Sequence, residues 1–287
     1  MVKIVGDTTS SLAASVAQAY DIAIIPQVIN FGEESYLEGV DIDYGTFMSR
    51  LKTERELPKT AAPPPELFAN VFKRHAQMAE PLVCILPSAL VSGTVRSAMV
   101  AQEILREQGV QGLDVRVIDT GVISSPVATL LQLAAVWARD GMDAATIELK
   151  IRAMCPRVRL YFLVDTLKYL AKGGRIGGAA ALLGGVLQVK PVLMFREGQV
   201  DTFEKVRTHR RAVDRLKELV VEQISPNEDG HLTILHAAAE AEAEELRSYF
   251  AERLGVSDIP VHTVPPAVVT HGGPGALGVG FFVEEHL

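Results

Sequence analysis

The sequence predicts an α/β protein made of two α/β domains, and three observations support this prediction. Short apolar runs alternate with longer amphipathic segments along the chain, as strands and helices do in layered α/β folds. The length of 287 residues favours two domains, at roughly 150 residues each. The pattern changes near residue 150, so we expect an N-terminal domain over residues 1–150 and a C-terminal domain over residues 151–287.

The first half predicts a parallel sheet, because short buried strands alternate there with helices. The expected strands are Val2–Val5, Ile22–Pro26, Leu82–Leu86 and Val115–Ile118. The expected helices are Leu12–Tyr20, Tyr44–Leu51, Glu66–Ala79, Gly93–Gln108 and Val127–Asp140. The uncharged stretch Gly121–Ala138 is long enough to raise the question of a membrane-spanning helix, but Pro126 and Gln132 within it favour a buried helix.

The second half predicts a mixed sheet. The segment around Glu197-Gly198 has the pattern of a hairpin, which places two antiparallel strands side by side. The expected strands are Leu160–Val164, Lys190–Arg196, Val200–Val206, Leu232–His236 and Val261–Val264. The expected helices are His209–Gln223 and Ala238–Leu254.

Composition excludes several classes of protein. The chain is 48% hydrophobic and 22% charged, which excludes a disordered chain. Its two cysteines, Cys84 and Cys155, lie in apolar runs, which excludes a disulfide scaffold and a four-ligand zinc site. The histidines show no paired ligand spacing, so we expect no metal and no cofactor. The first residues lack the apolar core of a secretory signal, so we expect a cytoplasmic protein without an integral membrane segment.

The charge is unevenly distributed. The net charge of −7 argues against a general nucleic-acid binder. Residues 157–217 nevertheless hold 13 Lys and Arg against 5 Asp and Glu, whereas residues 218–287 hold 2 against 12. The basic stretch is either a set of solvated faces or a docking surface for an acidic partner or anionic ligand. It lacks aromatic platforms and any nucleic-acid motif, so no nucleic acid is expected as a partner.

Two polar segments directly follow expected strands, where α/β sheets bind ligands. Asp7 follows the first strand, and it or the hydroxyls after it are expected to cap the next helix. The alternative, a phosphatase-like nucleophile, needs a second aspartate where Thr9 stands. Ser92-Gly93-Thr94 opens a helix, where Ser92 is either an N-cap or, with the helix N–H groups, part of an anion site.

Two glycine-rich segments are further candidates. Lys172–Gly178 is either a flexible turn between helices or a backbone cradle for an anion. His271 lies in the segment Thr270–Gly278, which we interpret as a glycine-rich turn. A histidine there can donate to a carboxylate or act as an acid, base or nucleophile. We therefore expect a functional role for His271.

Taken in order, seven segments of the chain resemble the DegV family of bacterial fatty-acid-binding proteins. They are IVGDTTSSL, KTAAPPPELF, SALVSGTVRSA, VIDTGVISS, YLAKGGRIG, KPVLMFREGQV and THGGPGALGVGF, and they extend over essentially the whole chain. The resemblance implies two α/β domains with a ligand cleft between them that holds one long-chain fatty acid. It further implies a carrier without catalysis of its own, which presents the carboxylate to a separate fatty acid kinase. By the same resemblance, the acyl-phosphate so formed would enter phospholipid metabolism.

The resemblance also implies site residues. Thr60, Ser92 and the backbone N–H of Gly93 match positions that bind the carboxylate, and His271 matches a histidine that completes the network. Arg207 matches an arginine associated with kinase interaction. The chain departs from the family at Ala61-Ala62, which replace Ser-Gln, and at Ser125-Pro126, where the family has a glycine-rich stretch.

The chemistry of the residues agrees with a carboxylate ligand. A carboxylate in an apolar cleft needs several donors, because an unpaired buried charge is costly. Ala179–Val189 and Val122–Trp137 are apolar segments suited to line a dry tunnel for the acyl chain. The alternative function is a dihydroxyacetone-kinase-like enzyme in which His271 holds the substrate covalently. The sequence shows no nucleotide-binding motif, which argues against that alternative.

Overall fold

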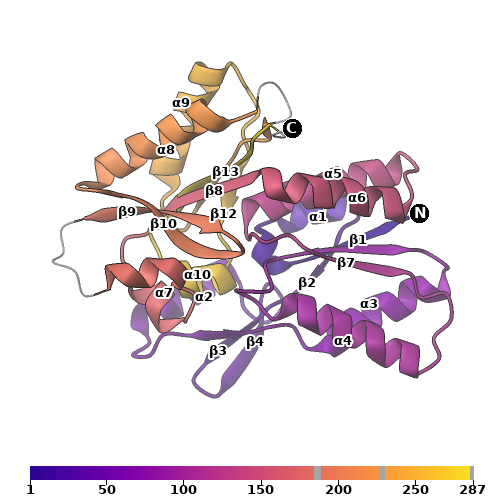
Figure 1. Ribbon diagram of the computed structural model, residues 1–287. Coiled ribbons are helices and arrows are strands. Elements are labelled where there is room, and N and C mark those ends of the chain that lie inside the picture. The colour runs from indigo at the N-terminus through magenta and orange to yellow at the C-terminus, as the bar shows by residue number, and fades with distance from the viewer. Residues whose placement is uncertain (184–188, 226–229, 285–287) are drawn as a thin grey trace. The chain divides into compact units, whose positions relative to one another are not determined.

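The computed structural model describes residues 1–183, 189–225 and 230–284 (Figure 1). The chain divides into two units, Met1–Cys155 and Pro156–Leu287. The boundary expected after residue 150 falls inside helix α6 (Ala144–Met154), which the sequence analysis did not predict. Because Ala144, Ile147 and Ile151 of this helix are buried, it belongs to the core of the first unit. Among the described residues, no helix combines the length and apolarity needed to cross a bilayer.

The first unit contains the expected parallel sheet. Its strand order is β2-β1-β6-β7, and all neighbours are parallel. The strands are β1 (Lys3–Asp7), β2 (Ala23–Ile25), β6 (Leu82–Leu86) and β7 (Val115–Asp119). The prediction of a parallel N-terminal sheet is confirmed.

Helices cover both faces of this sheet. One hydrophobic cluster joins Val5 and Leu86 of the strands to α3 (Pro65–Gln77) and α4 (Thr94–Glu107). On the other face, a Cβ at Gly6 would lie 2.6 Å from Leu131 of α5 (Ser125–Arg139). The short helices η1 (Thr8–Ser10) and α1 (Ala14–Ala19) follow β1.

A second, antiparallel sheet in the first unit was not predicted. Its order is β4-β3-β5, from β3 (Val28–Phe31), β4 (Glu34–Leu37) and β5 (Lys59–Ala61). These strands are at most four residues long; β4 and β5 are mostly polar, and Asn30 interrupts the apolar residues of β3. The ring of Phe31 packs 5.9 Å from that of Phe47 in α2 (Tyr44–Thr53).

The second unit contains the expected mixed sheet. Its order is β10-β9-β8-β13-β11-β12, in which only the pairing of β11 with β12 is parallel among the described strands. The strands are β8 (Val158–Leu163), β9 (Lys190–Arg196), β10 (Gln199–Val206), β11 (Thr233–His236), β12 (Val261–Thr263) and β13 (Leu277–Phe282). Glu197 and Gly198 have φ of 49° and 81°, so the predicted hairpin turn is confirmed.

Strand β13, an inner strand of this sheet, was missed because of its glycines. A Cβ at Gly278 would lie 2.8 Å from the Cβ of Phe162 and 2.8 Å from the carbonyl oxygen of Tyr161. Glycine is therefore required there by the close approach of β8. The glycines of Thr270–Gly278 had led us to predict a turn for this part of the chain.

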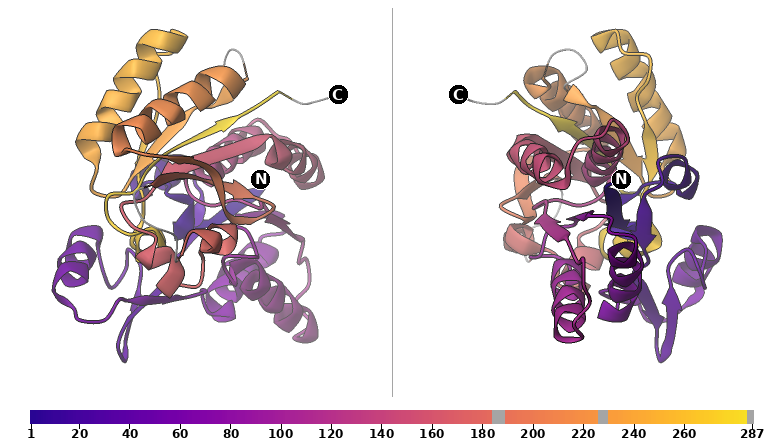
Figure 2. Two further views of the ribbon diagram at one scale, coloured as in Figure 1. Left: turned by 60° about the vertical axis from the view of Figure 1, so that its left-hand side comes forward. Right: turned by 90° about the vertical axis from the view of Figure 1, so that its right-hand side faces the viewer.

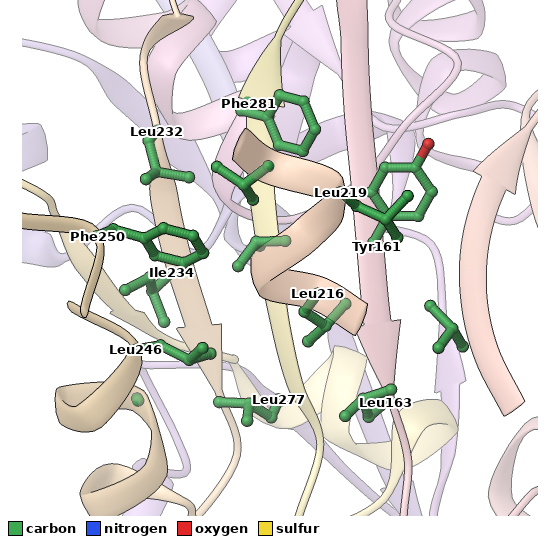
Figure 3. Close-up of a cluster of buried hydrophobic side chains, with 14 of the residues drawn as sticks. Tyr161, Leu163, Leu216, Leu219, Leu232, Ile234, Leu246, Phe250, Leu277 and Phe281 are labelled. Atoms are coloured by element: carbon green, nitrogen blue, oxygen red, sulfur yellow. The ribbon is translucent and has the colours of Figure 1, made fainter. Parts of the chain in front are cut away.

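Helices α8 (His209–Gln223) and α9 (Glu240–Leu254) cover one face of the mixed sheet (Figure 2). Figure 3 shows Leu216 and Leu219 of α8 among buried side chains from β8, β11, β13 and α9. The labelled partners are Tyr161, Leu163, Leu232, Ile234, Leu246, Phe250, Leu277 and Phe281. Two short helices, α7 (Lys168–Lys172) and α10 (Pro266–Gly272), pack together at the carboxyl ends of β8 and β12.

Candidate functional site

The predicted ligand residues of the first unit lie on two neighbouring segments. Thr60 is the middle residue of β5 and pairs with Ile29 of β3. Ser92 and Gly93 lie in the loop between β6 and α4. A Cβ on Gly93 would lie 3.2 Å from the Cβ of Ala62, so the loop packs against the segment that follows Thr60. The structure thus brings these three predicted residues to one locality.

The start of α4 is built differently from the expected serine cap. The N-cap position is Gly93, and the Ser92 hydroxyl accepts from the Thr94 N–H at 3.3 Å. Ser92 Oγ also lies 2.7 Å from Thr94 Oγ1. Ser92 is half-buried, whereas Thr94 is fully buried. The partly exposed hydroxyl of Ser92 is therefore in direct contact with the buried hydroxyl of Thr94.

A chain of buried polar side chains leads inward from Ser92. Gln27 Nε2 donates to Thr94 Oγ1 at 2.8 Å and to Asp7 Oδ2 at 2.5 Å. Asp7 Oδ1 accepts from the Thr9 hydroxyl at 2.6 Å and from the Thr9 N–H at 3.1 Å. We call Asp7, Gln27, Thr94 and Ser92 the Asp7 chain. It links the ends of β1 and β2 to the first turn of α4.

Asp7 is the ionisable member of this chain. Its side chain is inaccessible to solvent, and burial raises its pKa to about 6, against hydrogen bonds from Thr9, Gln27 and Thr94 that lower it. The expected capping role is confirmed only for the short helix η1, whose N-cap is Asp7. The sequence analysis missed the contact of Asp7 with Gln27 and, through the Gln27 amide, the connection to Thr94.

His271 lies in the second unit, in the last turn of α10. The interpretation of this segment as a turn was wrong at His271 itself, because the helix continues to Gly272. The turn follows instead, at Gly273 and Gly275, with φ of 80° and 79°. Prolines at 265 and 266, where the chain enters this helix, and the glycines that follow it concealed the helix from sequence reasoning.

The surroundings of His271 keep its imidazole neutral. Burial, and secondarily the positive charge of Arg175, lower its pKa to about 4. The Arg175 guanidinium is held by donation to the carbonyl oxygen of Gly173 at 2.8 Å. A Cβ on Gly173 would collide with Nδ1 of His271. At neutral pH, His271 therefore carries one ring N–H and no charge.

The glycine-rich segment Lys172–Gly178 joins α7 to the short helix η3 (Gly177–Leu182), so its interpretation as a turn between helices is confirmed. A Cβ on Gly177 would collide with the Val200 carbonyl oxygen of β10. A Cβ on Gly178 would collide with the Asp201 carboxylate of the same strand. Packing against β10 accounts for both glycines.

Arg207 is exposed at the end of β10. Lys205 and Arg210 are exposed beside it in the sequence. Farther along α8, Arg215 forms ion pairs with Glu204, Glu218 and Glu222, and Arg211 pairs with Glu218. Part of the basic stretch is therefore neutralised by ion pairs. Lys205, Arg207 and Arg210 form one group of exposed cations in this stretch, and Lys168 and Lys172 of α7 are exposed as well.

Two apolar segments were expected to line a tunnel for the acyl chain, and the structure describes only one of them in full. Val122–Trp137 lies mostly in α5, whose Val127, Leu130 and Leu131 are fully buried within the first unit. Of Ala179–Val189, residues 184–188 lie outside the described residues. Ser124, next to the departure at Ser125-Pro126, has a φ of 68°, a conformation that favours glycine.

Comparisons with known proteins agree over nearly the whole chain. The model of the DegV family, described as uncharacterised protein, matches residues 1–284. A DegV domain-containing protein of Halalkalibacterium halodurans is 33% identical over 289 residues, with 99% of each chain covered. The crystal structure of a stearic acid-binding protein from Eubacterium ventriosum has a TM-score of 0.88 at 26% identity, covering 99% of this chain and 98% of that one. DegV of Bacillus subtilis, a fatty acid binding protein, has a TM-score of 0.87 at 27% identity, covering 99% of both chains.

The raised pKa of Asp7 predicts that its burial destabilises the protein as the pH rises. An unfolded aspartate has a pKa of about 3.9, so between about pH 4 and pH 6 the folded state binds more protons than the unfolded state. Relative to Asp7→Asn, the free energy of unfolding of the wild type should fall by about 2–3 kcal/mol across this window and then stay constant. Urea unfolding of both proteins at a series of pH values measures this difference. Equal slopes against pH would show that folding does not raise the pKa of Asp7.

Proposed function

The chain belongs to the DegV family, and from this premise we propose that it is a carrier that binds a single long-chain fatty acid. The observation that supports this most strongly is its similarity, over 99% of its length, to two fatty-acid-binding proteins of known structure. Carrier and ligand would act in the cytoplasm. The head-group residues we propose are Thr60, Ser92, the backbone N–H of Gly93, and His271.

All four proposed contacts are neutral donors. Thr60 and Ser92 are half-buried hydroxyls, and His271 is neutral because its pKa is held near 4. A carboxylate accepts hydrogen bonds only, so it can be satisfied by several such donors without a bidentate arginine. The Arg175 charge near His271 adds a favourable field for an anion.

Neutral donors suit a ligand that must react while bound. We propose that a separate kinase uses the bound carboxylate as a nucleophile. An oxygen of the carboxylate forms a bond to the γ-phosphorus of the nucleotide, the bond from that phosphorus to the β-phosphate oxygen breaks, and the nucleoside diphosphate leaves. The acyl-phosphate product would supply phospholipid synthesis. The carrier itself would contribute no catalytic group.

Exposed cations around Arg207 suit the docking of that kinase. Lys205, Arg207 and Arg210 are exposed where β10 leads into α8. Arginine at a surface pairs well with carboxylates of a partner and steers its approach. We therefore assign Arg207 to partner binding and not to the fatty acid.

The carrier function predicts saturable binding of one fatty acid per chain. Delipidated protein is titrated with saturated fatty acids of about 14 to 18 carbons, since each buried methylene contributes about 0.8 kcal/mol. Native mass spectrometry measures the stoichiometry. Binding of none of these acids would contradict the proposal, and a covalent adduct with dihydroxyacetone at His271 would replace it with an enzymatic function.

The head-group assignment predicts that Ser92→Ala and Thr60→Ala each weaken fatty-acid binding by about 1–3 kcal/mol, the usual cost of removing a partner from a buried charge. The matched control is Ser225→Ala, which removes a buried hydroxyl in the second unit. Isothermal titration calorimetry with the same fatty acid measures all three variants. Unchanged affinity in the Thr60→Ala, Ser92→Ala double variant would remove both residues from the site.

The assignment of Arg207 predicts a separation of two activities. Arg207→Ala should bind fatty acid with wild-type affinity, but the cognate kinase should phosphorylate the bound acid more slowly. Arg253→Ala, an exposed arginine at the end of α9, is the control for loss of surface charge. Loss of fatty-acid binding in Arg207→Ala would place this residue at the head group. Wild-type rates of phosphorylation would leave it as a solvated surface residue.

A further inference from the structure

The distance between the two proposed hydroxyl contacts has to be held closely. A hydroxyl lies about 2.5–3.0 Å from the oxygen that accepts its hydrogen bond, and Thr60 and Ser92 are proposed to hold one carboxylate. Thr60 comes from β5 and Ser92 from the loop before α4. A shift of one segment by about 1 Å would therefore take one hydroxyl out of reach of the carboxylate while the other stayed in place.

Strand β5 does little to fix the position of Thr60 by itself. It is three residues long and lies at the edge of its sheet, where β3 is its one neighbour among the described strands. Thr60 pairs there with Ile29. A strand with so few backbone hydrogen bonds can shift at its carboxyl end unless the segment that follows it is anchored.

The segment that follows β5 has few backbone donors with which to anchor itself. Residues 63–65 are prolines, which have no N–H to donate. Their carbonyl oxygens still accept hydrogen bonds. The Pro64 carbonyl accepts from the Leu67 N–H at 3.1 Å, at the start of α3. The carbonyl of the buried Pro63 accepts from the Ser97 hydroxyl of α4 at 2.5 Å. Ser97 therefore anchors this segment to α4.

Ser97 is also bonded to the loop that carries Ser92. Its N–H donates to the Gly93 carbonyl at 3.0 Å. Gly93 in turn packs against the segment after β5, since a Cβ there would lie 3.2 Å from the Cβ of Ala62. One residue thus bonds the Ser92 loop through its backbone and the segment after β5 through its side chain.

We propose that Ser97 is a positioning residue that holds Thr60 within reach of a carboxylate bound at Ser92. The inference rests on the proposed function and goes beyond it, because it assigns a role in binding to a residue that acts through the Pro63 carbonyl. Without the Ser97 hydroxyl, this carbonyl loses its donor. A buried carbonyl without a donor is costly, so the segment shifts toward another donor or water. Thr60, three residues earlier in the chain, shifts with it.

Apolar packing keeps α3 and α4 together without this hydrogen bond. Phe68 of α3 and Ala98 and Ala101 of α4 belong to one buried hydrophobic cluster. Such packing has no preferred direction, whereas a hydrogen bond fixes the distance and the angle between two groups. We therefore expect Ser97→Ala to fold with α3 and α4 in contact, but with Thr60 displaced.

A double-mutant cycle tests whether Ser97 acts through Thr60. The affinity of the full chain for myristic acid is measured by isothermal titration calorimetry for the wild type, Ser97→Ala, Thr60→Ala and the double variant. Ser97→Ala should weaken binding about three- to tenfold, a typical effect of losing one hydrogen bond. In the Thr60→Ala background the same substitution should weaken binding less than about twofold, because the hydroxyl that it displaces is already absent.

Two comparisons distinguish positioning from a general defect. Ser92 is held by its own loop and by Thr94, so Ser97→Ala should keep its effect of about three- to tenfold in the Ser92→Ala background. The matched control is Gln102→Met, which removes another donor of α4. Gln102 Nε2 donates to the Val115 carbonyl of β7 at 2.8 Å, and its loss should leave the affinity within about twofold of the wild type.

Hydrogen exchange of the ligand-free protein detects the anchoring without a fatty acid. The amides of residues 59–62 should exchange about threefold faster or more in Ser97→Ala than in the wild type, because the segment after β5 is no longer held. In Gln102→Met these amides should exchange at the wild-type rate. Unchanged exchange in Ser97→Ala would overturn the inference.

The outcomes separate this inference from the proposed function. Wild-type affinity in Ser97→Ala, or an equal loss in the wild-type and Thr60→Ala backgrounds, would overturn the positioning role while fatty-acid binding stands. Failure of the wild type to bind myristic acid would overturn the carrier function, and the inference with it. If Ser97→Ala does not fold, Ser97→Cys takes its place, because a thiol is only a weak donor, and the same two results would overturn the inference.

Discussion

The carboxyl edge of the first sheet is organised by one constraint, the burial of the Asp7 carboxyl group. A carboxyl group without access to water must be matched by donors, and Asp7 takes them from Thr9 and Gln27. The Gln27 amide also donates to Thr94. Thr9 lies in η1, Gln27 directly precedes β3, and Thr94 lies in the first turn of α4. The constraint therefore holds three segments in place around the loop that carries Ser92. The buried Asp7 carboxyl group thus supports the Ser92 loop from inside the first unit.

In the second unit, glycines hold the segments around His271 in place because they allow these segments to pack closely. Gly173 allows the ring of His271 to lie against α7, and Gly177 allows η3 to lie against β10. Arg175, between them, is held by the carbonyl oxygen of Gly173. Glycines that would elsewhere indicate a mobile loop here fix a neutral histidine beside a cation. A neutral donor near a positive charge is an environment suited to an anion.

Much of the fold could be predicted because its strands and helices have strong local patterns. The residues of β6 are fully buried, and α4 and α8 have regular apolar faces. The small sheet of β3, β4 and β5, helix α10 and strand β13 could not, because short polar strands, prolines and glycines hide them. Of the proposed head-group residues, Ser92, Gly93 and His271 stand out in the sequence by themselves, whereas Thr60 was identified only by resemblance. The partners of Asp7 could not be predicted, since Gln27 lies 20 residues away and itself contacts Thr94 across 67 residues.

The central claim is that hydroxyl, backbone and imidazole donors hold the carboxylate of a fatty acid. A crystal structure of the protein loaded with stearic acid tests it most directly. The account predicts a carboxylate within about 2.7–3.2 Å of the hydroxyls of Thr60 and Ser92 and of the Gly93 N–H, with His271 donating to it directly or through one water. An acyl chain whose carboxylate is held by other residues, or that faces solvent, would contradict the account.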